Sequence, residues 1–239
     1  MRFILLLLSL SLTHQITAQI SLDKLKSVAN KAQEVISPKS LTVEEITRGL
    51  KEALIIGASE SSLNASKEGG FNNNLLIRIP FPKDANIMKE MLLKVGMQSQ
   101  IDEFEYILNL AAEEASNFSK QIFINAIQEM TIEDALSILQ GNDDAATNYL
   151  KKTTSKKLYI TFKPVILRSI NKVRLSVSWS SLAERYNAIP LTKDINCDLE
   201  DYVTNKVIEG LFILIAQEEK NIRNNPKARV SEILHKVFK

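Results

Sequence analysis

The chain has 239 residues, of which 45% are apolar and 24% are charged. This balance is typical of a globular protein whose core is large enough to need no disulfide or metal. Seven Gly and six Pro are few for this length, which argues against a β-sandwich or barrel and favours long helices. The 30 basic and 28 acidic residues are interspersed along the chain, so we expect no nucleic-acid partner.

The N-terminus has the three-part pattern of a secretory signal peptide. Arg2 precedes an apolar run from Phe3 to Leu12, and small and polar residues follow up to Ala18. The run is too short for a permanent anchor, so we expect a signal peptide at 1–18 and no transmembrane segment in the mature chain. A hydrophobic helix that stays attached is the alternative. No Cys lies near the cleavage site, which predicts a periplasmic or secreted protein without a lipid anchor.

The helical domain is expected at 41–239, after a leader helix and linker at 19–40. Thr42 and Glu45 form a capping-box pattern, which predicts that the first helix of the domain begins there. We expect this helix to fade within the small and polar residues of 57–70, where two adjacent glycines indicate a loop.

The stretch FNNNLLIRIPFP, residues 71–82, is the one segment that the sequence predicts to be extended. Pro80 and Pro82 exclude a helix interior and restrict the residue before each of them to extended backbone. Arg78 is the only charged residue of the stretch. We expect a short strand or an ordered arm that lies over the helices.

Helical periodicity continues from residue 83 to the C-terminus, with short connections. Gly141 is expected to end one helix, and Asp143 or Asn142 to cap a short one that follows and reaches about Lys152. Ser155 is then expected to begin another helix, which Pro164 would kink or split.

The longest helical pattern runs from Asp198 to Asn224 without an internal Pro. Its residues Leu211 to Ala216 are apolar on every side of the helix, and such a segment must be surrounded by protein. We therefore predict an all-α fold: a single compact multi-helix bundle around this long apolar C-terminal helix, with one short extended arm. A further amphipathic helix is expected to close the chain.

Few residues are available for enzyme chemistry. Beyond the expected cleavage site the chain has one His, His235, and one Cys, Cys197, which excludes a zinc site built from His and Cys. Glycine-rich phosphate loops and a nucleophile elbow are absent from the sequence. We expect no cofactor, and a protein without catalysis is favoured over an enzyme.

Asp143 and Asp144 are the first carboxylates of interest because they stand between two predicted helices. Thr147 and Thr153 follow near the helix ends, where backbone amides and lysines could hold a small anion. Helix capping is the structural alternative for Asp143.

Glu209 is the second carboxylate of interest because the long helix becomes apolar around it. A buried carboxylate needs a cationic partner, and we expect Arg78 first and Arg168 second. A structural ion pair is the alternative to a functional role. Glu218 and Glu219 are adjacent further along, and the structural alternative for them is a solvated helix face.

Five stretches together resemble a bacterial family designated domain of unknown function 4197. They are GNDDAATNYLKKTTSKKL, IRIPFP, ERYNAIP, DLEDYVTNKVIEGLF and AQEEKNIRNNPKARVSEILHKVF, and they span roughly 41–239. The resemblance implies an exported or envelope-associated helical protein of Gram-negative bacteria and brings no established activity. Many members carry a lipoprotein-type leader, whose cysteine this chain lacks. The positions that match the family motifs are Arg78, Pro80, Asp143, Asp144, Thr147, Thr153, Tyr186, Pro190, Tyr202, Glu209, Gly210, Glu219, Arg223, Pro226 and Arg229.

Three hypotheses follow. The first is a non-catalytic binding or scaffold protein of the cell envelope, whose partner is an unknown envelope protein or small ligand, provided that the arm 77–82 folds near the joint 141–158. The second is a metal-assisted hydrolase that uses Asp143 or Asp144 with Glu209 or Glu219. The third is a membrane-surface protein that uses a leader helix at 21–36, whose apolar face is modest. The candidate ligand-binding residues of the first hypothesis are Arg78, Asp143, Asp144, Thr147, Thr153 and Glu209.

Overall fold

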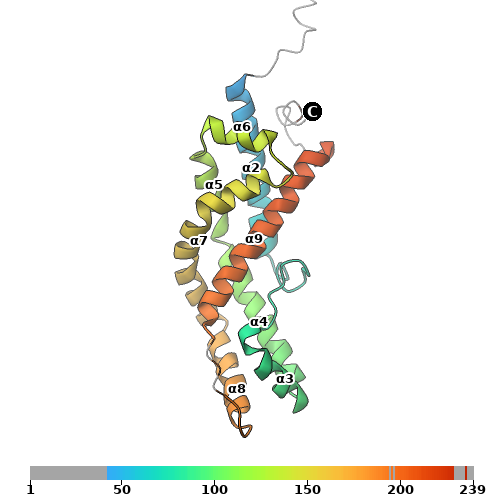
Figure 1. Ribbon diagram of the computed structural model, residues 1–239, viewed down its shortest axis with the longest axis vertical. Coiled ribbons are helices and arrows are strands. Elements are labelled where there is room, and N and C mark those ends of the chain that lie inside the picture. Colours follow the sequence, from blue (N-terminus) through green and yellow to red (C-terminus); the bar gives the residue numbers. More distant parts are fainter. Residues whose placement is uncertain (1–41, 194, 196, 229–234, 236–239) are drawn as a thin grey trace, which may run out of the picture. The chain divides into compact units, whose positions relative to one another are not determined.

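A computed structural model describes residues 42–193, 195, 197–228 and 235, which belong to a unit that spans 42–239. The expected signal peptide, leader helix and closing helix lie outside the described residues. Helices make up most of the described part of the chain (Figure 1), which contains no strand, so the predicted all-α fold is confirmed. Their connections are short except at 67–82 and 188–198. The elements are α2 (Val43–Ser66), η1 (Lys83–Ala85), α3 (Asn86–Lys94), α4 (Gln98–Ser116), α5 (Ser119–Gln128), α6 (Ile132–Gln140), α7 (Ala145–Lys172), α8 (Leu175–Asn187), α9 (Leu199–Asn224) and η2 (Pro226–Ala228).

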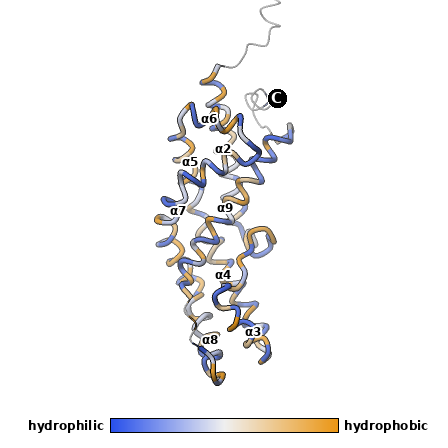
Figure 2. Tube along the Cα trace, in the orientation of Figure 1, coloured by the Kyte–Doolittle hydropathy of each residue, from blue (hydrophilic) through white to orange (hydrophobic). Residues whose placement is uncertain are grey.

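The helix α9 is the centre of the bundle, as the sequence predicts. It packs against α7, α2 and α4, and Figure 1 shows it beside α7 along much of its length. Of its apolar run 211–216, Ile213 and Ala216 keep partial exposure, and the other four residues are buried. Phe212 meets Phe123 of α5 edge to face, with ring centroids 5.7 Å apart. In the described helices, hydrophilic and hydrophobic stretches alternate (Figure 2), and none is both long and apolar enough to cross a membrane.

The helix α2 ends at Ser66, within the stretch 57–70 where it is expected to fade, and Gly69 and Gly70 lie in the loop that follows. The small residues there lie on its buried face and let neighbouring helices approach closely. A Cβ on Gly57 would lie 3.4 Å from the Cβ of Glu218 on α9. The Ser62 hydroxyl donates to the carbonyl of Ala58 and accepts from Ser119 of α5. Small polar residues that resemble a loop in the sequence are here a close helix contact.

The helix α7 is unbroken from Ala145 to Lys172, so a new start at Ser155 and a split at Pro164 are both wrong. The hydroxyl of Ser155 donates to the carbonyl of Lys151, one turn earlier. Thr153 does the same to Tyr149 over 2.8 Å. Such back-bonding satisfies the hydroxyl groups within a helix, and tertiary packing of α7 on α9 and α4 outweighs the backbone hydrogen bond that Pro164 removes.

The segment 67–82, which we call the arm, is ordered and lies on one face of α4. Glu105, Asn109 and Glu113 stand four residues apart on α4 and are all buried. The Glu113 carboxylate accepts from the backbone N–H groups of Gly69, Phe71 and Asn72 over 3.1–3.2 Å. The buried backbone of the arm is therefore satisfied by side chains, where a strand would use a neighbouring strand.

The second half of the arm is held by the other two side chains. Asn109 accepts from the N–H of Ile79 and donates to its carbonyl, both over 2.8 Å. The Glu105 carboxylate accepts from the N–H of Phe81 at 3.3 Å and from Lys89 at 2.6 Å. Phe81 itself is buried against the ring of Phe104, with centroids 5.1 Å apart. The expectation of an ordered arm over the helices is confirmed, and its form is not a strand.

Candidate functional site

Arg78 and Glu209 do not meet, which corrects the expected ion pair. The Arg78 guanidinium lies 3.3 Å from Glu105 on α4. Glu209 is exposed and pairs with Lys206 at 2.6 Å. The turn of α9 directs Gly210, and not Glu209, toward the arm, because a Cβ on Gly210 would lie 2.9 Å from the Phe71 ring. The expectations that Glu209 is buried and that Arg78 or Arg168 neutralises it are wrong.

Asp143 and Asp144 are both exposed at the joint between α6 and α7. Asp144 occupies the N-cap position of α7, but its side chain makes no capping hydrogen bond. Asp143 accepts a long hydrogen bond of 3.3 Å from the Asn224 amide of α9. The expectation that Asp143 caps the helix is therefore wrong.

Glu219, near the C-terminal end of α9, satisfies the α7 N-terminus instead. Its carboxylate is buried and accepts from the N–H groups of Ala146 and Thr147 at 2.9 and 2.8 Å. It also accepts from the Thr147 hydroxyl at 2.8 Å. A carboxylate in this place neutralises the free amides and the positive end of the helix dipole. The expectation of a solvated Glu219 is wrong.

Arg223 completes the joint from the next turn of α9. Its guanidinium donates to Glu219 over 2.9 and 3.1 Å and to the carbonyl of Ile138, in the last turn of α6, over 2.8 Å. Arg223 thus places a cation at the C-terminal end of α6, and Glu219 places an anion at the N-terminal end of α7. This accounts for the joint structurally, with every oxygen of Glu219 occupied.

The residues of the first hypothesis do not converge. Arg78 and Thr147 are bound by different carboxylates on different helices, and Thr153 is exposed on α7. Within the described ranges, no hydrogen bond or ion pair links the arm 77–82 with the joint 141–158. Nor does that part of the chain hold a group of three or more His, Cys, Asp or Glu side chains placed to bind a metal. The hydrolase hypothesis therefore has no geometric support.

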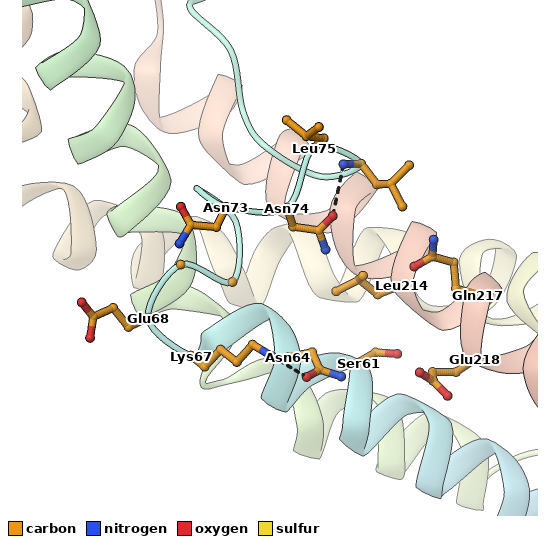
Figure 3. Close-up of a pocket in the computed structure, with 13 residues that line it drawn as sticks. Ser61, Asn64, Lys67, Glu68, Asn73, Asn74, Leu75, Leu214, Gln217 and Glu218 are labelled. Atoms are coloured by element: carbon orange, nitrogen blue, oxygen red, sulfur yellow. Dashed lines mark hydrogen bonds between the residues drawn. The ribbon is translucent and has the colours of Figure 1, made fainter. Parts of the chain in front are cut away.

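A groove elsewhere is the candidate site that the structure offers. It lies between the C-terminal half of α2, the first part of the arm and α9, and its volume is about 650 Å³ (Figure 3). This volume is within the range of about 300–1,000 Å³ that ligand pockets occupy. We call it the α2–α9 groove. Its lining residues are Ser61, Asn64, Lys67, Glu68, Gly69, Gly70, Asn73, Asn74, Leu75, Leu76, Leu214, Gln217 and Glu218.

Four of the eight polar side chains that line the groove are amides, and the others are Ser61, Lys67, Glu68 and Glu218. Asn73 and Asn74 come from the arm, Asn64 from α2 and Gln217 from α9, as Figure 3 shows. The amide oxygen of Asn74 accepts from the N–H of Leu76 at 3.1 Å, which folds the arm beside the groove. None of the described residues that line the groove is aromatic.

The groove wall depends on two glycines of the arm. Gly69 has a φ of +74°, a conformation that residues with a side chain rarely adopt. A Cβ on Gly70 would lie 2.4 Å from the backbone oxygen of Asn64, so the arm passes directly against the end of α2. This close approach places Asn73 and Asn74 across from α9.

Ser61 lies at the floor of the groove. Its side chain is fully buried, and its hydroxyl is the one buried side-chain polar atom in the described ranges that has no hydrogen-bond partner. Figure 3 shows this hydroxyl directed from α2 toward the α9 side of the groove, where Glu218 lies. A buried polar atom without a partner costs about 1–3 kcal/mol. A ligand group that reaches Ser61 would recover that free energy.

Two apolar residues flank the polar groups. Leu75 is 89% exposed and Leu76 is 60% exposed, both on the arm. Sequence reasoning missed this site because it expected α2 to fade within 57–70 and treated 71–82 only as an extended arm. The run of three Asn followed by two Leu is the signal that could have indicated the groove. Exposed leucines beside amides favour a binding surface over a simple turn.

The comparisons with known proteins identify the family. The family model described as "Protein of unknown function (DUF4197)" matches residues 40–239. The chain belongs to this family. In this DUF4197 protein, the residues matched by the family model include those of the α2–α9 groove, the arm and the joint of α6 with α7. No curated protein and no solved structure was found to match the chain.

Proposed function

We propose that this DUF4197 protein is a non-catalytic binding protein of the cell envelope, and that its α2–α9 groove binds an extended peptide segment of a partner protein. The observation that carries the proposal is the groove of about 650 Å³, lined by side-chain amides, with the buried Ser61 hydroxyl, which has no partner in the described chain, at its floor. Folding leaves this polar group unsatisfied, and a bound ligand would satisfy it.

The amide lining supports a peptide as the ligand. An Asn or Gln side chain both donates and accepts, so it matches the N–H and C=O of one peptide group. The molecule already uses this recognition, because Asn109 binds both backbone groups of Ile79 over 2.8 Å. Leu75 and Leu76 supply apolar contacts for the side chains of a bound segment. The lack of an aromatic lining residue disfavours a sugar, whose ring would stack on one.

The chemistry of the groove supports binding over catalysis. Among the described residues that line the groove, Ser61 is the only one with a hydroxyl, and none is a His or Cys that could act as base or nucleophile. Burial raises the pKa of the Cys197 thiol, as do Asp84 and Asp198, and a raised pKa disfavours the reactive thiolate.

Export is the second part of the proposal. The signal-peptide pattern of residues 1–18 supports it, since that pattern directs a chain out of the cytoplasm. Mass spectrometry of the protein from an envelope fraction should give a chain that begins after about Ala18. Recovery of the chain with its first residues intact from the cytoplasm would contradict export.

The groove is tested with a random heptapeptide library displayed on phage and selected on the purified protein. Peptides with a shared sequence are expected, and calorimetry should show that N73A/Q217A weakens their binding at least tenfold. The matched control is Q121A on α5, an exposed amide far from the groove in the sequence, which should bind them as the wild type does. Selection of no peptide, or equal binding by N73A/Q217A, would refute the peptide groove.

The Ser61 hydroxyl has its own variant, S61A. It removes a buried polar atom without a partner, so stability should be unchanged or higher while peptide affinity falls. This combination separates a ligand contact from a structural role, because a structural hydroxyl would lower both. The thermal unfolding midpoint and the calorimetric Kd are the two measurements.

A further inference from the structure

The helix α7 has a charge pattern unlike that of the rest of the chain. Its 28 residues include seven basic side chains and no acidic one. The whole chain has 30 basic and 28 acidic residues, so what remains outside α7 is net acidic. The positive charge of the protein is thus concentrated on one helix, which lies at the left edge of the bundle in Figure 1.

Three of the seven cations are paired and four are not. Lys157 and Lys163 lie 4.0 Å from Glu129 and Asp201, and Lys172 lies 2.7 Å from Glu114. Within the described chain, no ion pair or hydrogen bond engages the side chains of the other four, although Asp134 is near enough to Lys152 to interact electrostatically. All four are exposed: Lys151, Lys152, Lys156 and Arg168.

Exposed aliphatic side chains continue the same face. Ile160 is 62% exposed and Leu167 is 40% exposed. Together with Lys152, Lys156 and Pro164 they recur every three or four residues, which places them on one side of the helix. From Lys152 to Leu167 this stripe extends about 22 Å along the helix. We call it the α7 stripe.

We infer that the α7 stripe docks the protein on the surface of a bilayer that contains anionic lipids. Lysine and arginine side chains are attracted to anionic headgroups, and the aliphatic side chains between them can enter the boundary between headgroups and acyl chains. Exposed cations alone would also fit an acidic protein. The exposed Ile160 and Leu167, which lie along α7 between Lys156 and Arg168, favour the bilayer, because a bilayer offers both charge and an apolar layer to one helix face.

This inference is independent of the peptide groove, which α7 does not line. It also differs from the third hypothesis, because the contact is made by α7 and not by the leader residues 21–36. Two charge-reversal variants distinguish membrane contact through α7 from membrane contact through the leader: K152E/K156E/R168E on α7 and K24E/K26E in the leader.

The test is co-sedimentation of the purified chain with vesicles of phosphatidylglycerol and phosphatidylcholine in equal parts. We expect binding that phosphatidylcholine alone does not support and that 500 mM NaCl abolishes, because salt screens the attraction. The α7 variant should bind at least about 100-fold more weakly, since each cation near an anionic surface contributes about fivefold. The leader variant should bind as the wild type does.

Two further variants decide between a bilayer and another polyanion. K83E/K94E/K220E carries the same charge change on other elements, and it should retain most of the binding. I160S/L167S should weaken vesicle binding at least fivefold while binding to poly-glutamate stays unchanged. Wild-type chain that does not sediment with the anionic vesicles, or I160S/L167S that binds them as tightly as the wild type, would overturn the inference.

Discussion

The Glu219–Arg223 pair gives the sharpest test of how the bundle is held together. The change E219Q preserves the size of the side chain and removes its charge. One carboxylate oxygen accepts from both the N–H and the hydroxyl of Thr147, and the other accepts from Ala146 and Arg223. The Gln side chain has one oxygen and one NH₂ group in place of the two carboxylate oxygens. In either orientation its NH₂ faces the donors of Thr147 or those of Ala146 and Arg223, and that set of donors loses its acceptor.

The expected cost follows from burial. The side chain of Arg223 is 10% exposed and that of Glu219 4%, so neither group can turn to water. Breaking a buried ion pair by changing one partner costs about 3–5 kcal/mol. For a chain of this size about 2–4 °C of melting temperature corresponds to each kcal/mol, which gives a decrease of about 6–20 °C.

Urea unfolding followed by circular dichroism measures the loss in free energy of unfolding. If the dependence of this free energy on urea concentration has the same slope in both proteins, the two-state comparison holds. E218Q is the matched control, because it removes the same charge one residue away from a partly exposed side chain. It should alter the free energy of unfolding by no more than about 0.5 kcal/mol. The double variant E219Q/R223Q should cost clearly less than the sum of the two single changes. A loss below about 1 kcal/mol for E219Q would show that the pair does not join α6 and α7 as described.

Two other positions give tests of the arm. G210V places side-chain atoms where a Cβ already lies 2.9 Å from the Phe71 ring and 3.2 Å from Ile77, so limited proteolysis should cut within 71–82 faster than in the wild type. G57A, whose Cβ would make an ordinary contact of 3.4 Å, should not have this effect. Burial, with Cys197 and nearby carboxylates, raises the pKa of Tyr202 to about 12, and its hydroxyl donates to the carbonyl of Pro80. Because the folded pKa is above that of a free tyrosine, the stability from this group is complete below about pH 10 and falls as the pH rises toward 12. Stability measured across this range should decrease less in Y202F, and an equal decrease would contradict the assignment.

Local signals in the sequence predicted much of the fold. Thr42 with Glu45 forms the capping box that the sequence predicts, and Thr131 with Asp134 forms another from the same kind of pattern. Asp198 caps α9 by accepting from the N–H of Asp201. These features depend on residues three positions apart, so a single sequence contains all the information they need. The burial of α9 was predictable for a similar reason, because an apolar run has no other environment.

The polar interior could not be predicted in this way. Glu219 stands beside Glu218 in a charged stretch, and its partner Ala146 lies 73 residues earlier in the chain. Glu113 and the arm amide of Phe71 are 42 residues apart. A carboxylate that binds backbone amides of a distant segment has the same local sequence as a solvated one. The candidate groove was missed for the same reason, since it exists only where α2, the arm and α9 meet.

The face of α4 that holds the arm has a consequence for solubility. The stretch LLIRI, residues 75–79, is rich in branched apolar side chains, and an unpaired segment of this kind can add to the β-structure of another molecule. Asn109 occupies both backbone groups of Ile79, and Glu105 and Glu113 occupy amides on either side. Three polar side chains of α4 thus occupy backbone groups that could otherwise pair with a strand of another molecule. A variant without these side chains would expose an aggregation-prone segment while its helices are still folded.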